Sequence, residues 1–118
     1  MTKKIDLKRY MGTWEQVSVN PVPRFQKGCN DIKAVYTLRD DGRVDVLNIC
    51  DNRDIKGVAK SVSEDNRHLK VSFFPFVWSD YKIAFIDSDY KNAIVKSDKY
   101  VWQLKKIMEE KKYDPLGK

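Results

Sequence analysis

Apolar and polar residues alternate along most of this chain, in short runs separated by turn-forming residues. Alternation with a period of two places successive side chains on opposite faces of a β-strand, so the pattern predicts strands with one apolar face. Eight runs follow it, namely 14–19, 32–39, 44–50, 57–62, 69–74, 81–86, 93–95 and 100–104.

The segments between these runs predict how the strands connect. Asp40-Asp41-Gly42 is a strong hairpin turn. Asn20-Pro21-Val22-Pro23 must be a loop, because proline cannot donate to a ladder. Eight short strands with tight turns predict an up-and-down meander, which loses its exposed edges by closing into a barrel. We therefore expect an all-β fold, an eight-stranded antiparallel up-and-down β-barrel, as a single domain over residues 1–118.

The two ends of the chain depart from the strand pattern. Apolar residues between Ile5 and Met11 fit a short turn-rich lid before the first strand. After Leu104, the spacing of Ile107 and Met108 predicts a short C-terminal helix, which Asp114-Pro115 ends. The paired lysines and glutamates of 105–112 form the solvated face of this helix.

The alternation also predicts which side chains point into the barrel. The expected interior is rich in aromatic and branched residues, and its assigned ligand-binding positions are Tyr36, Val46, Asn48, Phe73, Tyr81, Ile83 and Trp102. Phe85 is also expected to point inward, on the same face of its strand as Tyr81 and Ile83. Gly57, Ala59 and Ser61 share one small face, which would leave empty volume if it points inward. Large residues filling that space are the alternative, since eight-stranded barrels do either, and we favour the cavity.

The first strand carries a further signal, the triplet Gly12-Thr13-Trp14. A Gly-x-Trp at the head of the first strand of an all-β chain suggests a barrel whose closed end is plugged by the tryptophan. Gly12 and Trp14 are therefore assigned a structural role, and barrels of this kind are usually containers.

An ordered set of segments along residues 6–104 resembles lipocalins, in particular the bacterial lipocalins related to apolipoprotein D. These segments are Gly12-Thr13-Trp14, 24–29, 36–42, 46–48, 71–76, 79–81, 89–90 and 100–102. The resemblance implies a calyx that binds fatty acids, lysophospholipids or other small apolar molecules. It also implies a periplasmic or outer-membrane location, although the start of the chain is equally compatible with a cytoplasmic protein.

The C-terminal part departs from the family pattern. In the family an arginine after the last barrel strand packs over the Gly-x-Trp tryptophan, and the nearest residue here is Lys106, which lacks a planar group for stacking. The family then has a long helix and an outer strand. Most of the family's helix has no counterpart in this chain before Tyr113-Asp114-Pro115. The family's outer strand has no counterpart either. Either the protein is naturally shortened, with a weaker barrel base, or further residues belong to it.

Cys29 and Cys50 flank the Asp40-Asp41-Gly42 hairpin, within a few residues of cross-strand register. A disulfide is feasible there, although register alone does not guarantee the required Cα distance. Two reduced thiols in a cytoplasmic protein are the alternative. The resemblance and the oxidising compartment that it implies favour the disulfide.

The charge and the chemistry-bearing residues exclude several function classes. The net charge of +6 comes from scattered Lys and Arg interleaved with 17 acidic residues, so we expect no nucleic-acid partner, while an anionic membrane surface stays compatible. Two Cys and one His at unrelated spacings make no metal site. His68 fits a solvated turn, and we expect no catalytic residue and no cofactor. The one enzyme alternative is a thiol-dependent isomerase using Cys50, which pairing with Cys29 would remove.

The main functional hypothesis is therefore a binding or transport protein for a small apolar ligand. The aromatic residues Phe25, Phe76 and Trp78 fall in expected mouth loops, where they guard the cavity or touch a membrane. Asn48, with Arg24 or Lys27 at the rim, would hold a polar head group. The alternative is a membrane-surface or protein-interaction module with a filled barrel.

Overall fold

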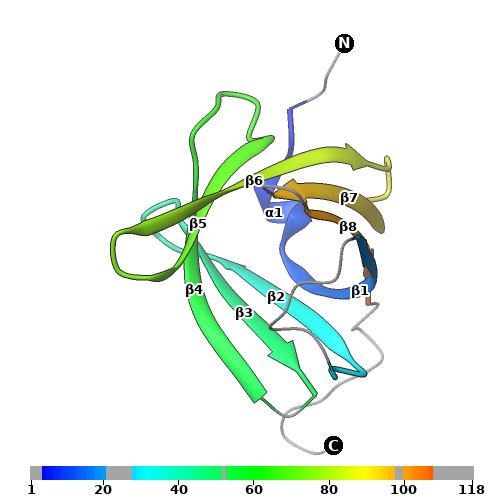
Figure 1. Cartoon of the computed structure of the whole chain (residues 1–118). Helices are drawn as coiled ribbons and strands as arrows, with labels where there is room; N and C mark the ends of the chain where they lie inside the picture. The colour runs from blue at the N-terminus through cyan, green and yellow to red at the C-terminus, as the bar shows by residue number, and fades with distance from the viewer. Residues whose placement is uncertain (1–3, 21–27, 52, 98–99, 108–118) are drawn as a thin grey trace, which may run out of the picture.

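The computed structural model describes residues 4–20, 28–51, 53–97 and 100–107 and has a closed barrel. The strands follow one another in chain order, each antiparallel to the next, and the last pairs with the first (Figure 1). The elements are α1 (Leu7–Tyr10), β1 (Gly12–Asn20), β2 (Ile32–Leu38), β3 (Val44–Cys50), β4 (Arg53–Ser61), β5 (His68–Phe74), β6 (Val77–Ile86), β7 (Asn92–Ser97) and β8 (Tyr100–Lys106). The predicted barrel is confirmed.

The short helix α1 leads directly into β1 and closes one end of the barrel. It begins because the Asp6 carboxylate accepts the backbone N–H of Lys8 at 3.0 Å, which caps the first turn. Ile5 and Tyr10 are buried on either side of this cap, 1% and 3% exposed. The segment that the sequence predicted as a turn-rich lid is therefore a capped helical turn packed into the core.

The base of the barrel is built around Trp14, whose side chain is fully buried. Its indole N–H donates to the Tyr10 carbonyl at 2.9 Å. The Lys106 ammonium lies 5.0 Å from the Trp14 ring centroid and donates to the Arg9 carbonyl. This is cation–π distance, so Lys106 does cover the tryptophan, as a point charge and not as a planar stack. Gly12 adopts a φ of +124°, which side-chain-bearing residues rarely reach.

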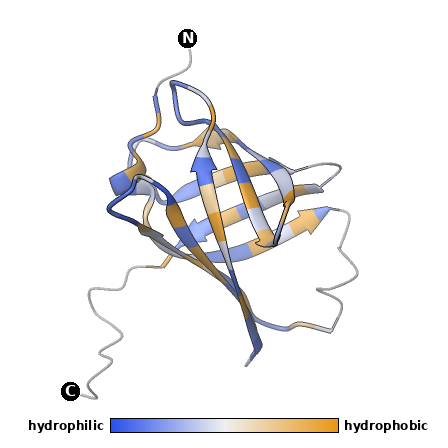
Figure 2. Cartoon of the chain, turned by 90° about the vertical axis from the view of Figure 1, so that its left-hand side faces the viewer, coloured by the Kyte–Doolittle hydropathy of each residue, from blue (hydrophilic) through white to orange (hydrophobic). Residues whose placement is uncertain are grey.

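Hydropathy alternates along the strands, as the sequence pattern predicted (Figure 2). The prediction fails in β6, where Phe85 was expected to point inward but is 47% exposed. The register between β6 and β7 shifts between Ile83 and Phe85, which is a β-bulge. The extra residue reverses the alternation, so Ile86 and not Phe85 packs against the core.

Several boundaries also differ from the sequence-based expectation. β4 begins at Arg53, four residues before the predicted run. Val77 and Trp78, expected in a mouth loop, begin β6 after a tight turn. Lys105 and Lys106, expected on a helix face, belong to β8, which pairs with β1. Ile107, also expected in the helix, is not helical, and its N–H donates to the Thr13 carbonyl at 2.9 Å. The expected helix from Met108 onward lies outside the described residues.

Candidate functional site

The barrel encloses a cavity of about 250 Å³. Its wall is mostly apolar and draws on α1 and all eight strands. Among the described residues that line it are Leu7, Tyr10, Gln16, Lys33, Ala34, Tyr36, Val46, Asn48, Ala59, Val71, Phe73, Ser79, Tyr81, Ser97, Tyr100, Trp102 and Leu104. The cavity volume is slightly below the ordinary range of small-molecule sites, which begins at about 300 Å³.

Most of the wall positions expected from the sequence lie on this cavity, namely Tyr36, Val46, Asn48, Phe73, Tyr81 and Trp102. Ile83 is buried at 2% exposure but packs in the core and is not among the described lining residues. The structure therefore brings six of the expected side chains together around one volume. Their contact with a ligand stays a prediction.

The small face of β4 points inward but is only partly empty. A Cβ placed on Gly57 would lie 2.6 Å from Cδ1 of Phe73, so the phenylalanine ring occupies the space that this glycine leaves. Ala59 is buried and does line the cavity. The expectation that the small residues leave empty volume is thus wrong at Gly57, because the Phe73 ring packs against this glycine.

The expected mouth aromatics do not line the cavity in the described part of the chain. Phe76 is 98% exposed at the turn between β5 and β6. Trp78 faces the outside of the barrel, where the Lys60 ammonium lies 4.5 Å from its ring centroid. Phe25, Arg24 and Lys27 lie outside the described residues.

Three tyrosines meet at the closed end of the cavity. The hydroxyl of Tyr81 lies 2.5 Å from that of Tyr10 and 3.0 Å from that of Tyr36, so Tyr81 bridges the other two. The Tyr10 and Tyr36 rings stack with centroids 5.6 Å apart, and Tyr10 also packs at 5.1 Å on Trp14. We call these three residues the tyrosine triad. It forms a polar floor on an aromatic base.

Burial keeps this floor uncharged. It raises the pKa of Tyr36 to about 12 and raises the pKa values of Tyr10 and Tyr81 well above the usual value. A phenol loses its proton reluctantly in an apolar site because the phenolate is poorly solvated there. A tyrosine is neutral at physiological pH in any case, and the raised pKa values keep the triad neutral into the alkaline range.

Sequence reasoning missed several polar contributors to the wall, among them Tyr10 and Lys33. Tyr10 belongs to the lid rather than to a strand, so strand alternation could not assign it. Strand alternation assigned Lys33 to the outward face, yet Lys33 borders the cavity. Its ammonium pairs with the Asp31 carboxylate at 2.7 Å. Lys33 is the one charged side chain among the described lining residues.

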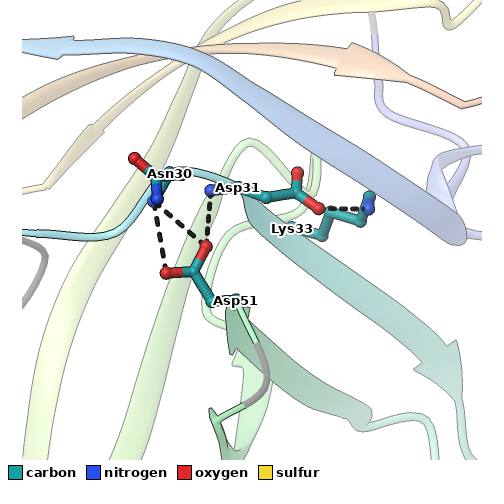
Figure 3. A network of polar contacts seen from close by, with 4 residues as sticks. All are labelled: Asn30, Asp31, Lys33 and Asp51. Atoms are coloured by element: carbon teal, nitrogen blue, oxygen red, sulfur yellow. Dashed lines mark hydrogen bonds and ion pairs between the residues drawn. The ribbon is translucent and has the colours of Figure 1, made fainter.

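The disulfide between Cys29 and Cys50 is present, with Cα atoms 5.5 Å apart, which confirms the expected pairing. Beside it, the Asp51 carboxylate accepts the backbone N–H groups of Asn30 at 3.1 Å and Asp31 at 2.9 Å (Figure 3). These contacts fix the chain entering β2 to the end of β3, at the end of the barrel opposite Trp14. Because Cys50 is bonded to Cys29, it offers no free thiol for the isomerase alternative.

The outer surface holds a second polar cluster around Asp80. Its carboxylate lies 2.8 Å from the Lys70 ammonium and 2.9 Å from His68 Nε2. Hydrogen bonds from Lys70 and then His68 lower the Asp80 pKa to about 2. His68 is thus a partly exposed strand residue in an ion-pair cluster, and not the solvated turn residue that the sequence suggested.

Neither a metal-binding cluster nor a membrane-spanning helix occurs in the part of the chain that the structure describes. No group of three or more His, Cys, Asp or Glu side chains is arranged to hold a metal ion there. No helix among the same residues is long and apolar enough to cross a membrane.

The comparisons with known proteins agree with this geometry. The Escherichia coli (strain K12) outer membrane lipoprotein Blc is 34% identical over 94 residues, which cover 74% of this chain and 52% of that protein. Temperature-induced lipocalin-1 of Arabidopsis thaliana is 34% identical and covers 98% of this chain and 72% of that protein. The chain spans about half the length of the bacterial lipoproteins that it matches.

Structure and family models give the same result. The crystal structure of the cockroach allergen Per a 4 aligns over 89% of this chain and 71% of that chain with a TM-score of 0.60, at 18% identity. That likeness concerns the fold alone. The model of the lipocalin-like domain matches residues 5–116, nearly the whole chain, and this match with the sequence relatives shows that the protein is a member of the lipocalin family.

Proposed function

We propose that this protein binds a small apolar molecule, such as a fatty acid or the acyl chain of a lysophospholipid, inside its barrel. The observation that carries the proposal is the cavity of about 250 Å³ with its mostly apolar wall. A methylene takes up about the volume of a water molecule, roughly 30 Å³, so the cavity holds roughly eight carbons. A longer chain would extend out of the cavity.

The strength of binding follows from the buried chain. Each buried methylene contributes about 0.8 kcal/mol, so a chain that fills only the cavity gains roughly 6 kcal/mol. Losses of translational and conformational freedom reduce this gain. We therefore expect dissociation constants in the tens of micromolar or weaker for medium-chain ligands. Lys33 and Asn48 are the described wall residues suited to an anionic or polar head group.

The first experiment is native mass spectrometry of the purified protein, followed by fatty-acid titration. A mass excess that disappears on denaturation supports the container function and identifies the ligand. Trp102→Ala removes a large part of the cavity wall, so we expect it to weaken fatty-acid binding at least tenfold. Trp78→Ala is the matched control, because it makes the same change on the outside of the barrel. Equal affinities of the two variants would contradict the interior site.

A second function is favoured by one observation, the exposed aromatic turn between β5 and β6. Phe76 is 98% and Val77 56% exposed, with Lys60 beside Trp78 on the same surface. Aromatic and basic side chains together suit a membrane surface. Vesicle binding that is lost in Phe76→Ser, without uptake of isolated lipid, would favour this function over the container.

The relatives motivate a proposal for location. The Escherichia coli protein is named an outer membrane lipoprotein, and the disulfide of this chain suits an oxidising compartment. We propose on these grounds that the protein resides in a bacterial envelope. Labelling of the free thiols in freshly lysed cells tests it, since a reduced Cys29–Cys50 pair would contradict this location.

A further inference from the structure

The tyrosine triad contains one more hydroxyl proton than its own hydrogen bonds use. Each phenol has one O–H donor, so the triad has three protons. Its two internal contacts, Tyr10 to Tyr81 and Tyr36 to Tyr81, use two of them. The three hydroxyls have no other hydrogen-bond partner among the described residues. One donor is therefore left over at the floor of the cavity.

All three tyrosines line the cavity, so the spare donor lies at the edge of the space that a ligand would fill. In the empty protein a water molecule can accept it. A pure hydrocarbon that displaced this water would leave a buried donor without a partner, which is unfavourable. A ligand with an oxygen at its leading end would restore the hydrogen bond.

The floor suits a neutral oxygen and not a carboxylate. Lys33, the one charged side chain among the described lining residues, pairs with Asp31 beside the disulfide. Lys106 lies against Trp14 and donates to the Arg9 carbonyl, and it is not among the lining residues. A carboxylate at the triad would thus be buried without a cation, which strongly opposes binding.

Resting on the proposed container function, we propose that the triad is a subsite for a neutral hydroxyl or carbonyl oxygen at the deep end of an apolar ligand. The protein then prefers apolar chains oxygenated at the far end over plain hydrocarbon chains. Any carboxylate of the same ligand stays toward the other end of the cavity, where Lys33 and Asn48 lie.

The count of protons decides which variant tests the subsite. Tyr36→Phe leaves two hydroxyls, one hydrogen bond between them and still one spare donor. Tyr81→Phe removes the bridge and leaves two spare donors. Only the triple variant Tyr10→Phe/Tyr36→Phe/Tyr81→Phe removes every donor, and it keeps all three rings and their packing.

The experiment compares decanoate with ω-hydroxydecanoate, which differ only by a hydroxyl at the end that would reach the triad. Dissociation constants are measured by calorimetric titration for the wild type, Tyr36→Phe, the triple variant and Tyr90→Phe. Tyr90→Phe is the control, since its hydroxyl accepts the Asp6 N–H at the closed end and Tyr90 does not line the cavity.

In the wild type and in Tyr36→Phe we expect ω-hydroxydecanoate to bind at least as tightly as decanoate. In the triple variant we expect it to bind about tenfold more weakly than decanoate, because its hydroxyl is then buried without a partner. Tyr90→Phe should keep the wild-type ratio. The same ratio of dissociation constants in the wild type and the triple variant would overturn the subsite while leaving the container function intact. Failure of the wild type to bind either ligand would overturn both.

Discussion

The tyrosine triad makes a prediction about stability that does not depend on any ligand. Removing the Tyr81 hydroxyl breaks two hydrogen bonds, those at 2.5 Å and 3.0 Å, whereas removing the Tyr36 hydroxyl breaks only the second. A hydrogen bond of this kind contributes about 1 kcal/mol to stability. We therefore expect Tyr81→Phe to lower the free energy of unfolding by about 2 kcal/mol and Tyr36→Phe or Tyr10→Phe by about 1 kcal/mol.

The triple variant distinguishes a shared hydrogen-bond network from three hydroxyl groups that contribute to stability independently. Independent effects of the single changes would sum to about 4 kcal/mol. Tyr81→Phe, however, owes part of its cost to a second unpaired donor, added to the one that the wild type already has, whereas Tyr36→Phe and Tyr10→Phe add none. The triple variant leaves none, because every partner is replaced by a ring of the same shape. We expect it to lose less than about 2 kcal/mol, and so to be more stable than Tyr81→Phe.

Urea unfolding followed by tryptophan fluorescence measures these differences, with the slope checked to be the same for every variant. Tyr90→Phe is again a useful reference, since it removes one hydroxyl that accepts a single hydrogen bond outside the triad. Tyr81→Phe and Tyr36→Phe of equal stability would refute the bridging role of Tyr81. A triple variant that loses the full sum would refute the shared network.

Three further predictions concern the titration of Tyr36, the disulfide and the packing at Gly57. Burial raises the pKa of Tyr36 to about 12, so its neutral form contributes stability below about pH 10 that is lost as pH rises toward 12; tyrosinate absorbance that develops fully near pH 10 would contradict this. Replacing Cys29 and Cys50 by Ser opens a link across 21 residues and should cost about 3 kcal/mol, with reducing agent lowering the unfolding midpoint of the wild type only. Gly57→Ala should cost about 1–3 kcal/mol in urea unfolding, because its Cβ would sit 2.6 Å from both the Phe73 ring and the Ser72 carbonyl oxygen; an unchanged midpoint would argue against this close packing.

Strand alternation predicted the barrel and most of its wall because the side-chain period in a strand is fixed at two. It failed at Phe85 because a bulge changes the period by one residue without a marked change in sequence: Ile83-Ala84-Phe85 reads as an ordinary alternating run. The bulge is a property of how β6 pairs with β7. A single sequence carries little signal for such a pairing.

The missed site residues have a different cause. Tyr10 lies only four residues before Trp14, in a segment too short to show a period of its own. Its place in the floor depends on the Asp6 cap, on the tilted ring contact with Trp14 and on contacts with strands far along the chain. Long-range contacts of this kind become visible only when the strands are placed around the barrel.

The base and the floor of the cavity are therefore one structure. Trp14 contacts both the Lys106 ammonium and the Tyr10 ring, and the hydroxyl of that same tyrosine joins the triad that lines the cavity. Tyr10 therefore links the residues of the base directly to the hydroxyl groups that we assign to ligand selection. The Gly-x-Trp end of the barrel thus closes the cavity and also supports the tyrosine hydroxyl groups at its floor. Its packing sets the orientation of the polar group that the deep end of a ligand would meet.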